Sequence, residues 1–222
     1  MNQKKIAVIT GSSKGIGAAT VQQFIRNGYF VHGIDIDPTL PTSNVFMYEH
    51  HIVDVSKFDT LPDIENVDIL INNAGTQEID KCISTNLGGL INTTRKYGLQ
   101  ENIKSICNLA SASSLHGAEF DTYVASKGGV ASYTIWTAKE LAKFGATCNA
   151  LSFGGVTTSL NQQVIDDKEK WNQIMELTPL KRWMSPEECA DWIYFITAIN
   201  RSCTGQNILI DNGEFYSHKF VW

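Results

Sequence analysis

The sequence has no Cys-x-x-Cys motif and no cluster of cysteine and histidine residues. Such spacings are the usual signatures of zinc sites and redox-active thiols. The cysteines are instead odd in number and widely scattered, at Cys82, Cys107, Cys148, Cys189 and Cys203. We therefore expect reduced thiols, several of them buried, with neither a disulfide framework nor a bound metal ion.

Runs of lysine or arginine are also missing, and the net charge is −5. Because a basic surface is what binds nucleic acid or anionic membranes, we expect neither partner. The longest compact apolar run, Trp192 to Ile199, is too short to cross a bilayer. The first residues, Met1 to Lys5, lead directly into a predicted strand without the pattern of a signal peptide, which predicts a cytoplasmic protein.

The composition is that of an ordinary soluble globular protein, with 43% hydrophobic and 18% charged residues. A chain of 222 residues is long enough to bury a good core as one domain. We find no internal repeat, linker or low-complexity segment, so residues 1–222 are predicted to form a single domain.

A glycine-rich segment, Thr-Gly-Ser-Ser-Lys-Gly-Ile-Gly at residues 10–17, follows the apolar run Ile6–Ile9 and precedes a helical pattern. Strand, glycine-rich turn and helix in this order indicate a dinucleotide site, because the glycines let the backbone approach a pyrophosphate at the helix N-terminus. The residues predicted to contact the cofactor here are Gly11, Ser13, Lys14, Gly15, Ile16 and Gly17.

A phosphate loop of the Walker type is the competing interpretation of this segment. That motif closes with Gly-Lys followed by Ser or Thr, whereas here Lys14 precedes Gly15 and Ile16. The order of the residues excludes it.

Two charged residues bear on which dinucleotide is bound. Asp35 ends the second predicted strand, eighteen residues after Gly17, where a carboxylate accepts hydrogen bonds from ribose hydroxyls and repels a 2′-phosphate. Lys14 could instead pair with such a phosphate. We weigh Asp35 more heavily and predict NAD(H), while Lys14 keeps NADP(H) open.

Short apolar runs bounded by turn residues recur along the chain, with helical patterns between them. The predicted strands are Ile6–Ile9, Tyr29–Ile34, Met47–Val53, Val67–Ile71, Ile103–Leu109, Thr147–Ser152 and Gln206–Ile210. Strands that alternate with helices predict an α/β fold, a doubly wound parallel sheet of about seven strands with helices on both faces.

Polar residues follow the third and fourth predicted strands, on the ligand edge of such a sheet. Asp54 and Val55 follow the third strand, and Asn72-Asn73-Ala74-Gly75 follows the fourth. Asp54 is suited either to hold the adenine amino group of a nucleotide or to cap a helix near Lys57, and the sequence leaves both interpretations open.

Tyr123 and Lys127 lie at the head of a long helical pattern that reaches about Phe144. Residues four apart on a helix share one face, so the phenol and the ammonium can serve one small volume. A nearby cation favours the phenolate, which would bring the tyrosine pKa toward the range useful for general acid/base chemistry. The same spacing also occurs by chance on solvated helices.

The C-terminal third contains a predicted helical stretch from Leu160 to Leu177 and a helix from Ser185 to Ile199, which begins with Ser185 as N-cap and Pro186 at the first position. Residues at about 157–184 would cover a substrate as a lid with Trp171 and Trp183 facing the ligand. Packing of these tryptophans on the domain explains the pattern equally well.

Two further groups could contribute to a substrate site. His116, Glu119 and Asp121 precede Tyr123 and could bind a polar substrate, although a solvated loop is the preferred interpretation. The aromatic tail from Phe215 to Trp222 is costly to expose, so we expect it to pack against its own cleft or a neighbouring subunit.

Taken in order, these motifs resemble the compact type of short-chain dehydrogenase/reductase over essentially the whole chain. The resemblance rests on residues 10–17, Asp54-Val55, 72–75, Asn86, Ser111, 123–127, the turn 154–158 and Thr204-Gly205. It implies a Rossmann-type sheet, a bound nicotinamide dinucleotide, and hydride transfer between that cofactor and a secondary alcohol or ketone.

The resemblance also implies roles for individual residues. Tyr123 would be the general acid/base, Lys127 would lower its pKa and hold the nicotinamide ribose, and Ser111 would hydrogen-bond the substrate oxygen, with Ser113 as the alternative serine. Asn86 would support a proton-relaying water. The remaining cofactor contacts would come from Asp54, Val55, Asn73, Ala74, Gly75, Gly154, Val156 and Thr158.

The chain departs from the family pattern in several places. The interval from Gly75 to Asn86 is short, and so is the connection between the third and fourth strands. In the family this region often builds a dimer interface, so a homodimer or homotetramer is expected but the usual tetramer is in doubt. Phe153 replaces a common proline, and the interval from Ser111 to Tyr123 is one residue short.

Two other functions deserve comparison with the oxidoreductase. A nicotinamide-sensing binding protein of the same fold would tend to lose the tyrosine or the lysine, and this chain retains both. An epimerase or dehydratase acting on nucleotide sugars shares that pair but usually has a larger C-terminal substrate domain, for which this chain has no room.

Overall fold

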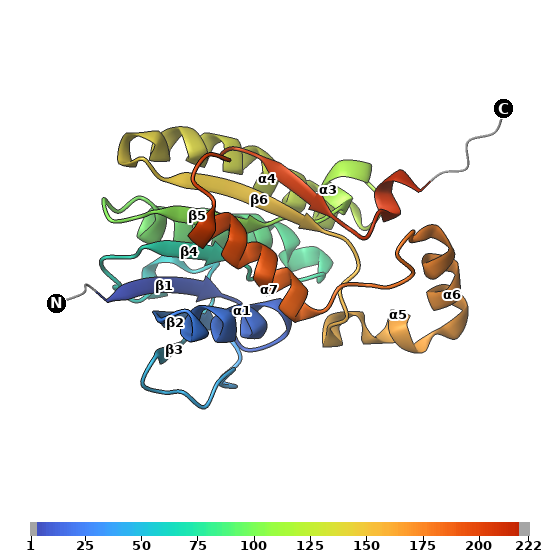
Figure 1. Ribbon diagram of the computed structural model, residues 1–222, viewed down its shortest axis with the longest axis horizontal. Coiled ribbons are helices and arrows are strands. Elements are labelled where there is room, and N and C mark those ends of the chain that lie inside the picture. The colour runs from blue at the N-terminus through green and yellow to red at the C-terminus, as the bar shows by residue number, and fades with distance from the viewer. Residues whose placement is uncertain (1–3, 218–222) are drawn as a thin grey trace.

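Seven parallel strands form one sheet in the order β3-β2-β1-β4-β5-β6-β7, in a computed structural model that describes residues 4–217 (Figure 1). The strands are β1 Lys5–Thr10, β2 Tyr29–Asp35, β3 Tyr48–Ile52, β4 Ile69–Asn72, β5 Ser105–Leu109, β6 Thr147–Phe153 and β7 Asn207–Ile210. The predicted fold class and all seven predicted strands are confirmed, with ends that shift by one or two residues.

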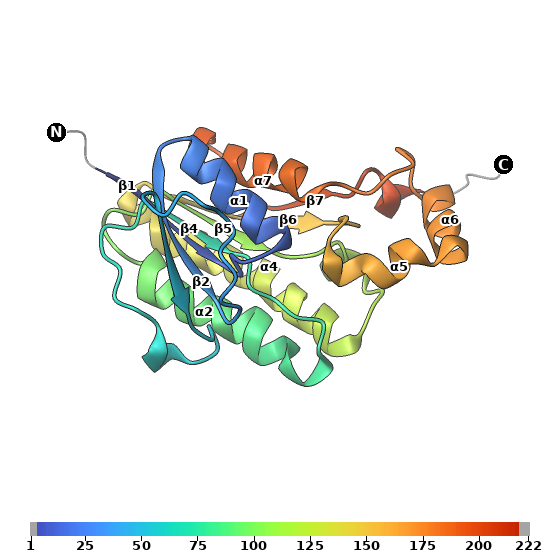
Figure 2. The same cartoon turned by 90° about the horizontal axis from the view of Figure 1, so that it is seen from below.

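Helices cover both faces of this sheet (Figure 2). α1 (Gly15–Arg26) and α7 (Pro186–Tyr194) lie on one face, and α4 (Asp121–Leu141) lies on the other beside a helical segment that spans residues 79–98 and includes α2 (Leu90–Thr93). The remaining α-helices are α3 Ser113–His116, α5 Gln162–Asp166 and α6 Lys168–Leu177.

The two layers of the core follow from the alternation of side chains along each strand. On β1, the fully buried Ala7 and Ile9 face the layer that contains Phe24 of α1. Val8, between them, faces the opposite layer, which contains Leu141 of α4. Burial on both faces explains why β1 is continuously apolar.

The connection between β3 and β4 contains one 3₁₀ turn, Phe58–Thr60, and no α-helix. This connection is therefore short, as the sequence indicated. Because a crossover helix here would pack on the sheet, its loss leaves the outer part of one face, at β2 and β3, without such a cover.

Three helical regions are irregular. The segment around Asn86 is helical, but Cys82–Gly89 and Thr94–Gly98 are wound as π-helix, and Phe195–Ile199 continues α7 in the same way. The stretch Leu160–Leu177, predicted as one helical run, is broken, and that prediction is wrong in this respect. Asp167 interrupts it and caps α6, where its Oδ1 accepts from the N–H of Glu169 and Lys170.

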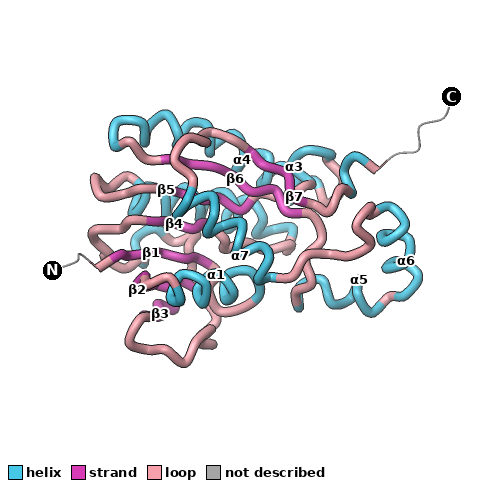
Figure 3. The backbone as a smooth tube through the Cα atoms, viewed as in Figure 1, coloured by secondary structure: helices cyan, strands magenta, loops and turns pink. Residues whose placement is uncertain are grey.

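The loops after the strands gather at one end of the molecule. In Figures 1 and 3, the carboxyl ends of the strands point toward the side that carries α3, α5 and α6. Within residues 4–217, no helix combines the length and apolarity that crossing a membrane requires.

Ser185 begins α7 as predicted, with a reciprocal capping box. Its side chain accepts from the N–H of Glu188, and the Glu188 side chain accepts from the N–H of Ser185. Replacing Ser185 with Ala should cost about 1 kcal/mol of stability, which lowers the midpoint of thermal unfolding by roughly 2–4 °C. Calorimetry of Ser185→Ala beside Ser202→Ala, an exposed loop serine, measures this; equal midpoints would contradict it.

Candidate active site

The glycine-rich turn after β1 is closed by residues that follow β4. The Asn73 side chain donates to the carbonyls of Thr10 and Gly11, both at 3.0 Å. The Thr10 hydroxyl accepts from the N–H groups of Asn73 and Ala74, again at 3.0 Å. A Cβ on residue 17 would lie 1.8 Å from the Gly11 carbonyl oxygen, so Gly17 permits a contact that no other residue can make.

The first turn of α1 has no side chain that satisfies its free N–H groups. Lys14 occupies the N-cap position without a side-chain hydrogen bond, and no acidic residue lies in the first turn. Unpaired N–H groups and the helix dipole make such a terminus suitable for an anion. The residues present therefore fit the pyrophosphate of a dinucleotide.

Asp35 lies at the end of β2, beside this turn. Its carboxylate accepts from the N–H of Ser13 at 2.9 Å and from the N–H of Asp37 at 2.9 Å. Lys14, the residue that kept NADP(H) open, forms an ion pair with Asp37 at 3.6 Å. The charge of Lys14 is thus partly balanced by a neighbouring carboxylate.

Tyr123 and Lys127 lie in the first turns of α4, as predicted. The Lys127 ammonium is buried, donates to the carbonyl of Leu109 at 2.8 Å and lies 5.7 Å from the centre of the Tyr123 ring. Burial lowers the pKa of Lys127 to about 8. Burial also raises the pKa of Tyr123 to about 12, to which the charge of Glu119 adds, while a hydrogen bond with Ser111 opposes the rise.

This shift differs from the sequence argument, which expected Lys127 to lower the pKa of Tyr123. In this structure, desolvation of the phenol outweighs the other influences on its pKa, so Tyr123 is uncharged at neutral pH.

Ser111 is the serine that lies beside Tyr123. It is 9% exposed, and its oxygen accepts from the N–H of Ser113 at 3.2 Å. The Ser113 hydroxyl is fully buried and has no hydrogen-bond partner. Ser111 is therefore the more accessible of the two serines, and its hydrogen bond to a substrate stays a prediction.

Asn86 is buried, and its side-chain amide clamps the loop after β4. Its oxygen accepts from the N–H of Thr76 at 2.7 Å, and its nitrogen donates to the Thr76 carbonyl and the Ser126 hydroxyl at 3.0 and 3.1 Å. A Cβ on Gly75 would lie 3.3 Å from this amide and 3.6 Å from the Lys127 ammonium. The fold thus brings Asn86 and Gly75 close to Lys127. That Asn86 holds a proton-relaying water stays a prediction.

The turn after β6 lies against the glycine-rich turn. A Cβ on Gly15 would lie 3.4 Å from the Thr158 side chain. Val156 is buried and pairs with Met184, and Gly154 donates to the carbonyl of Ile210 in β7. The turn after β6 and the glycine-rich turn, which both contain predicted cofactor residues, therefore lie side by side at Gly15 and Thr158.

The contacts of Asp54 and Val55 in the structure are structural and do not indicate a cofactor contact. The Asp54 carboxylate accepts from the N–H and hydroxyl of Ser56 at 2.9 and 2.7 Å, so it stabilises its own turn. Val55 is buried in the core layer of Leu141. A contact of Asp54 with adenine stays a prediction.

The predicted lid packs on itself and on the turn after β6. Trp171 and Trp183 meet edge to face at 5.0 Å, and Trp183 fills the space in which a side chain on residue 155 would lie. The Trp183 Nε1 is buried without a hydrogen-bond partner. The packing interpretation holds for Trp183, and the role of the lid in covering a substrate stays a prediction.

His116 and Glu119, which precede Tyr123 in the chain, interact with other residues of the site more closely than the sequence indicated. Phe215 stacks on His116 with ring centres 5.9 Å apart, so the tail begins by packing near the cleft; Phe220 and Trp222 lie outside the described residues. Glu119, preferred as a solvated residue, raises the pKa of Tyr123. Only its position two residues before the start of α4 pointed to this influence.

A family model described as enoyl-(acyl carrier protein) reductase matches residues 11–214 of the chain. The chain belongs to the short-chain dehydrogenase/reductase family. Among its relatives, a 3-oxoacyl-acyl-carrier-protein reductase of Thermotoga maritima is 30% identical over 240 residues, which cover 94% of this chain and 97% of the relative.

Solved structures of similar proteins carry nicotinamide cofactors. A 4-hydroxyisoleucine dehydrogenase mutant complexed with NADH and succinate is 28% identical, with coverage of 95% and 98% and a TM-score of 0.81. ElxO with NADP bound is 27% identical, with coverage of 96% and 100% and a TM-score of 0.85. This short-chain dehydrogenase/reductase is therefore an oxidoreductase that works with a nicotinamide dinucleotide.

The low pKa of Lys127 has a measurable consequence for stability. Between about pH 8 and the ordinary value of 10.5, the unfolded chain holds more protons at this residue than the folded chain. The contribution of Lys127 to stability therefore rises with pH across that window. The unfolding midpoint of the cofactor-free enzyme, relative to Lys127→Met, should rise by roughly 4–8 °C from pH 8 to pH 10, because this pKa difference corresponds to about 2 kcal/mol over that interval.

Lys139→Met, an exposed lysine of the same helix, is the matched control and should show no such trend. A difference between the enzyme and Lys127→Met that does not change with pH would contradict the buried charge.

Proposed function

We propose that the chain is an NAD(H)-preferring oxidoreductase that transfers hydride between the cofactor and a secondary alcohol or its ketone. One observation carries the proposal: Ser111 and Tyr123 lie together at the carboxyl edge of the sheet, with Lys127 beneath them. The uncapped start of α1 lies on the same edge.

The preference for NAD(H) rests on charge. The Asp35 carboxylate lies beside the backbone of Ser13, where a 2′-phosphate on the adenosine ribose would meet a negative group. Lys14 would offset this repulsion only if it broke its ion pair with Asp37 and paired with the phosphate instead. The NADH complex of the similar 4-hydroxyisoleucine dehydrogenase fits this preference, whereas ElxO, whose sequence identity to this chain is 27% against 28%, forms a complex with NADP.

The bound cofactor would supply the hydride. Tyr123 stays protonated up to a pKa of about 12, so it can donate its proton to the carbonyl oxygen as the ketone is reduced. Ser111 would donate a hydrogen bond to the same oxygen, where negative charge develops. Lys127, held by Leu109, would stabilise the phenolate left behind.

The names of the relatives support a carbonyl or alcohol substrate, since one reduces a 3-oxoacyl group and another is a dehydrogenase of a hydroxy amino acid. The prediction of a homo-oligomer is supported by Ile135 and Trp136 of α4, which expose 51% and 44% of their surface. A cytoplasmic location stays a prediction.

Removing the Tyr123 hydroxyl tests the catalytic role. Tyr123→Phe should lower turnover by roughly 10²- to 10⁴-fold and leave NADH affinity within a few-fold, because only proton transfer is lost. Tyr133→Phe, the same change on the same helix, is the control and should keep full activity. Stopped-flow NADH oxidation with a panel of ketones measures both; full activity in Tyr123→Phe would remove it as the acid.

Cofactor choice is tested by titrating fluorescence with NADH and NADPH. The unmodified chain should bind NADH more tightly, and Asp35→Asn should bring the two affinities closer by about tenfold, the effect of about 1.4 kcal/mol of lost repulsion. Asp37→Asn, which frees Lys14 but retains Asp35, should keep the preference. Relaxation in Asp37→Asn alone would assign the discrimination to Lys14, and binding of neither nucleotide would contradict the site.

A further inference from the structure

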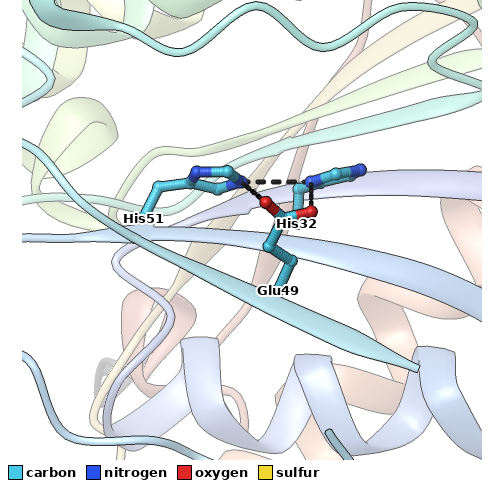
Figure 4. A group of neighbouring side chains, drawn as sticks. All are labelled: His32, Glu49 and His51. Atoms are coloured by element: carbon cyan, nitrogen blue, oxygen red, sulfur yellow. Dashed lines mark hydrogen bonds and ion pairs between the residues drawn. The ribbon is translucent and has the colours of Figure 1, made fainter. Parts of the chain in front are cut away.

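Two histidines and a glutamate converge on neighbouring strands, away from the catalytic edge (Figure 4). The Nδ1 of His32 lies 3.1 Å from the Nε2 of His51. The Glu49 carboxylate lies 3.4 Å from the His32 nitrogen and 3.9 Å from the His51 nitrogen. One nitrogen from each ring and the carboxylate thus point at one another.

The sheet register explains why these residues meet. His32 of β2 lies directly opposite Glu49 of β3, and His51 follows Glu49 by two residues on the same face. His50, between them, points to the other face and contacts the Tyr48 hydroxyl at 2.6 Å. The two strands therefore present Glu49, His51 and His32 as one triangle.

The dimensions of the triangle match those of a metal site. Ligand atoms about 2.0–2.1 Å from a tetrahedral zinc ion lie about 3.3–3.4 Å from one another. The two imidazole nitrogens lie 3.1 Å apart, and Glu49 Oε2 lies 3.4 Å from the His32 nitrogen, close to that value. The 3.9 Å contact of the His51 nitrogen is with the other oxygen, Glu49 Oε1, and one ligand atom from each residue lies within 4.8 Å of the other two. We propose that His32, Glu49 and His51 bind a divalent transition-metal ion of the zinc class.

The chemistry of the ligands selects the metal. Two imidazole nitrogens and one carboxylate suit Zn²⁺, Co²⁺ or Ni²⁺, whereas Mg²⁺ and Ca²⁺ prefer oxygen ligands. The histidine side chains are 14% and 16% exposed, and that of Glu49 is 55% exposed. The rings are therefore held in place, while an ion can enter past the glutamate and keep water as its remaining ligand.

The position of the site suggests what the ion does. β3 is the edge strand of the sheet, and the connection that follows it has no α-helix to cover this face. An edge strand without cover is held mainly by its ladder to one neighbour. An ion bound by β2 and β3 would join them through side chains and stabilise the edge, without a part in hydride transfer.

Titration of the full-length, untagged chain with Zn²⁺ against a chromogenic chelator tests the proposal. One ion should bind, and the unfolding midpoint should rise by about 5 °C or more at a hundredfold excess over the dissociation constant. Mg²⁺ should produce neither effect. Co²⁺ should give the visible bands of a tetrahedral nitrogen and oxygen site without the charge-transfer band of a thiolate, which separates this site from the cysteines.

The variants locate the ion. Glu49→Gln and His51→Gln should each weaken binding at least about 100-fold, since loss of outer contacts alone costs 10- to 100-fold. His50→Gln, a neighbouring histidine on the opposite face, should bind as the unmodified chain does. The proposal would be overturned if the unmodified chain did not bind Zn²⁺, or if Glu49→Gln and His51→Gln bound it as tightly as the unmodified chain does. The two histidines would then be only a hydrogen-bonded pair.

Discussion

The close approach of α1 to the turn after β1 is the contact on which the site depends. A side chain on residue 17 would overlap the carbonyl oxygen of Gly11, and that carbonyl is in turn held by Asn73 from the end of β4. Because Asn73 joins the two loops, the start of α1 is fixed relative to the strand end that leads toward Asn86 and Lys127. A larger residue at 17 would move α1 outward, and α7, which shares its core layer, would have to follow. One contact thus sets both the place for an anion and the packing of a whole face.

The burial of Tyr123 and Lys127 is the second constraint. It costs stability in the free chain, and it sets the protonation states that the proposed reaction needs. The same desolvation lowers the pKa of Lys127 and raises that of Tyr123, so each residue is driven toward its neutral form. A neutral phenol is what reduction of a ketone needs. The ammonium is retained by the Leu109 carbonyl. Under the proposed mechanism, this pair, which is costly to bury in the free chain, would gain favourable interactions when an anionic cofactor and a developing alkoxide are present, so that binding free energy would favour the transition state.

Most of the fold could be predicted from local signals, and the failures have physical causes. Apolar runs give β1, β4, β5 and β6 because these strands are buried on both faces. Ser185 gives the start of α7 because its capping box is purely local. The break at Asp167 was missed because Asp, Lys and Glu residues in succession also suit the solvated face of one continuous helix. The π-turn around Asn86 leaves no trace in hydrophobic periodicity. The pKa of Tyr123 could not be predicted, since the desolvation that sets it depends on how the folded chain buries the phenol.

The triangle of His32, Glu49 and His51 also could not be predicted from the sequence. A search for metal ligands in a sequence depends on short, regular spacing, and His32 is separated from Glu49 and His51 by a turn and a strand change. Only the register of β2 with β3 reveals that the three share a face. The shortened connection before β4 supplies the reason why polar residues occupy that face at all, because no helix packs on it. Solvation alone would be satisfied by any polar side chains, but it does not require three ligand atoms to converge on one point. That convergence distinguishes a metal site from an ordinary exposed strand.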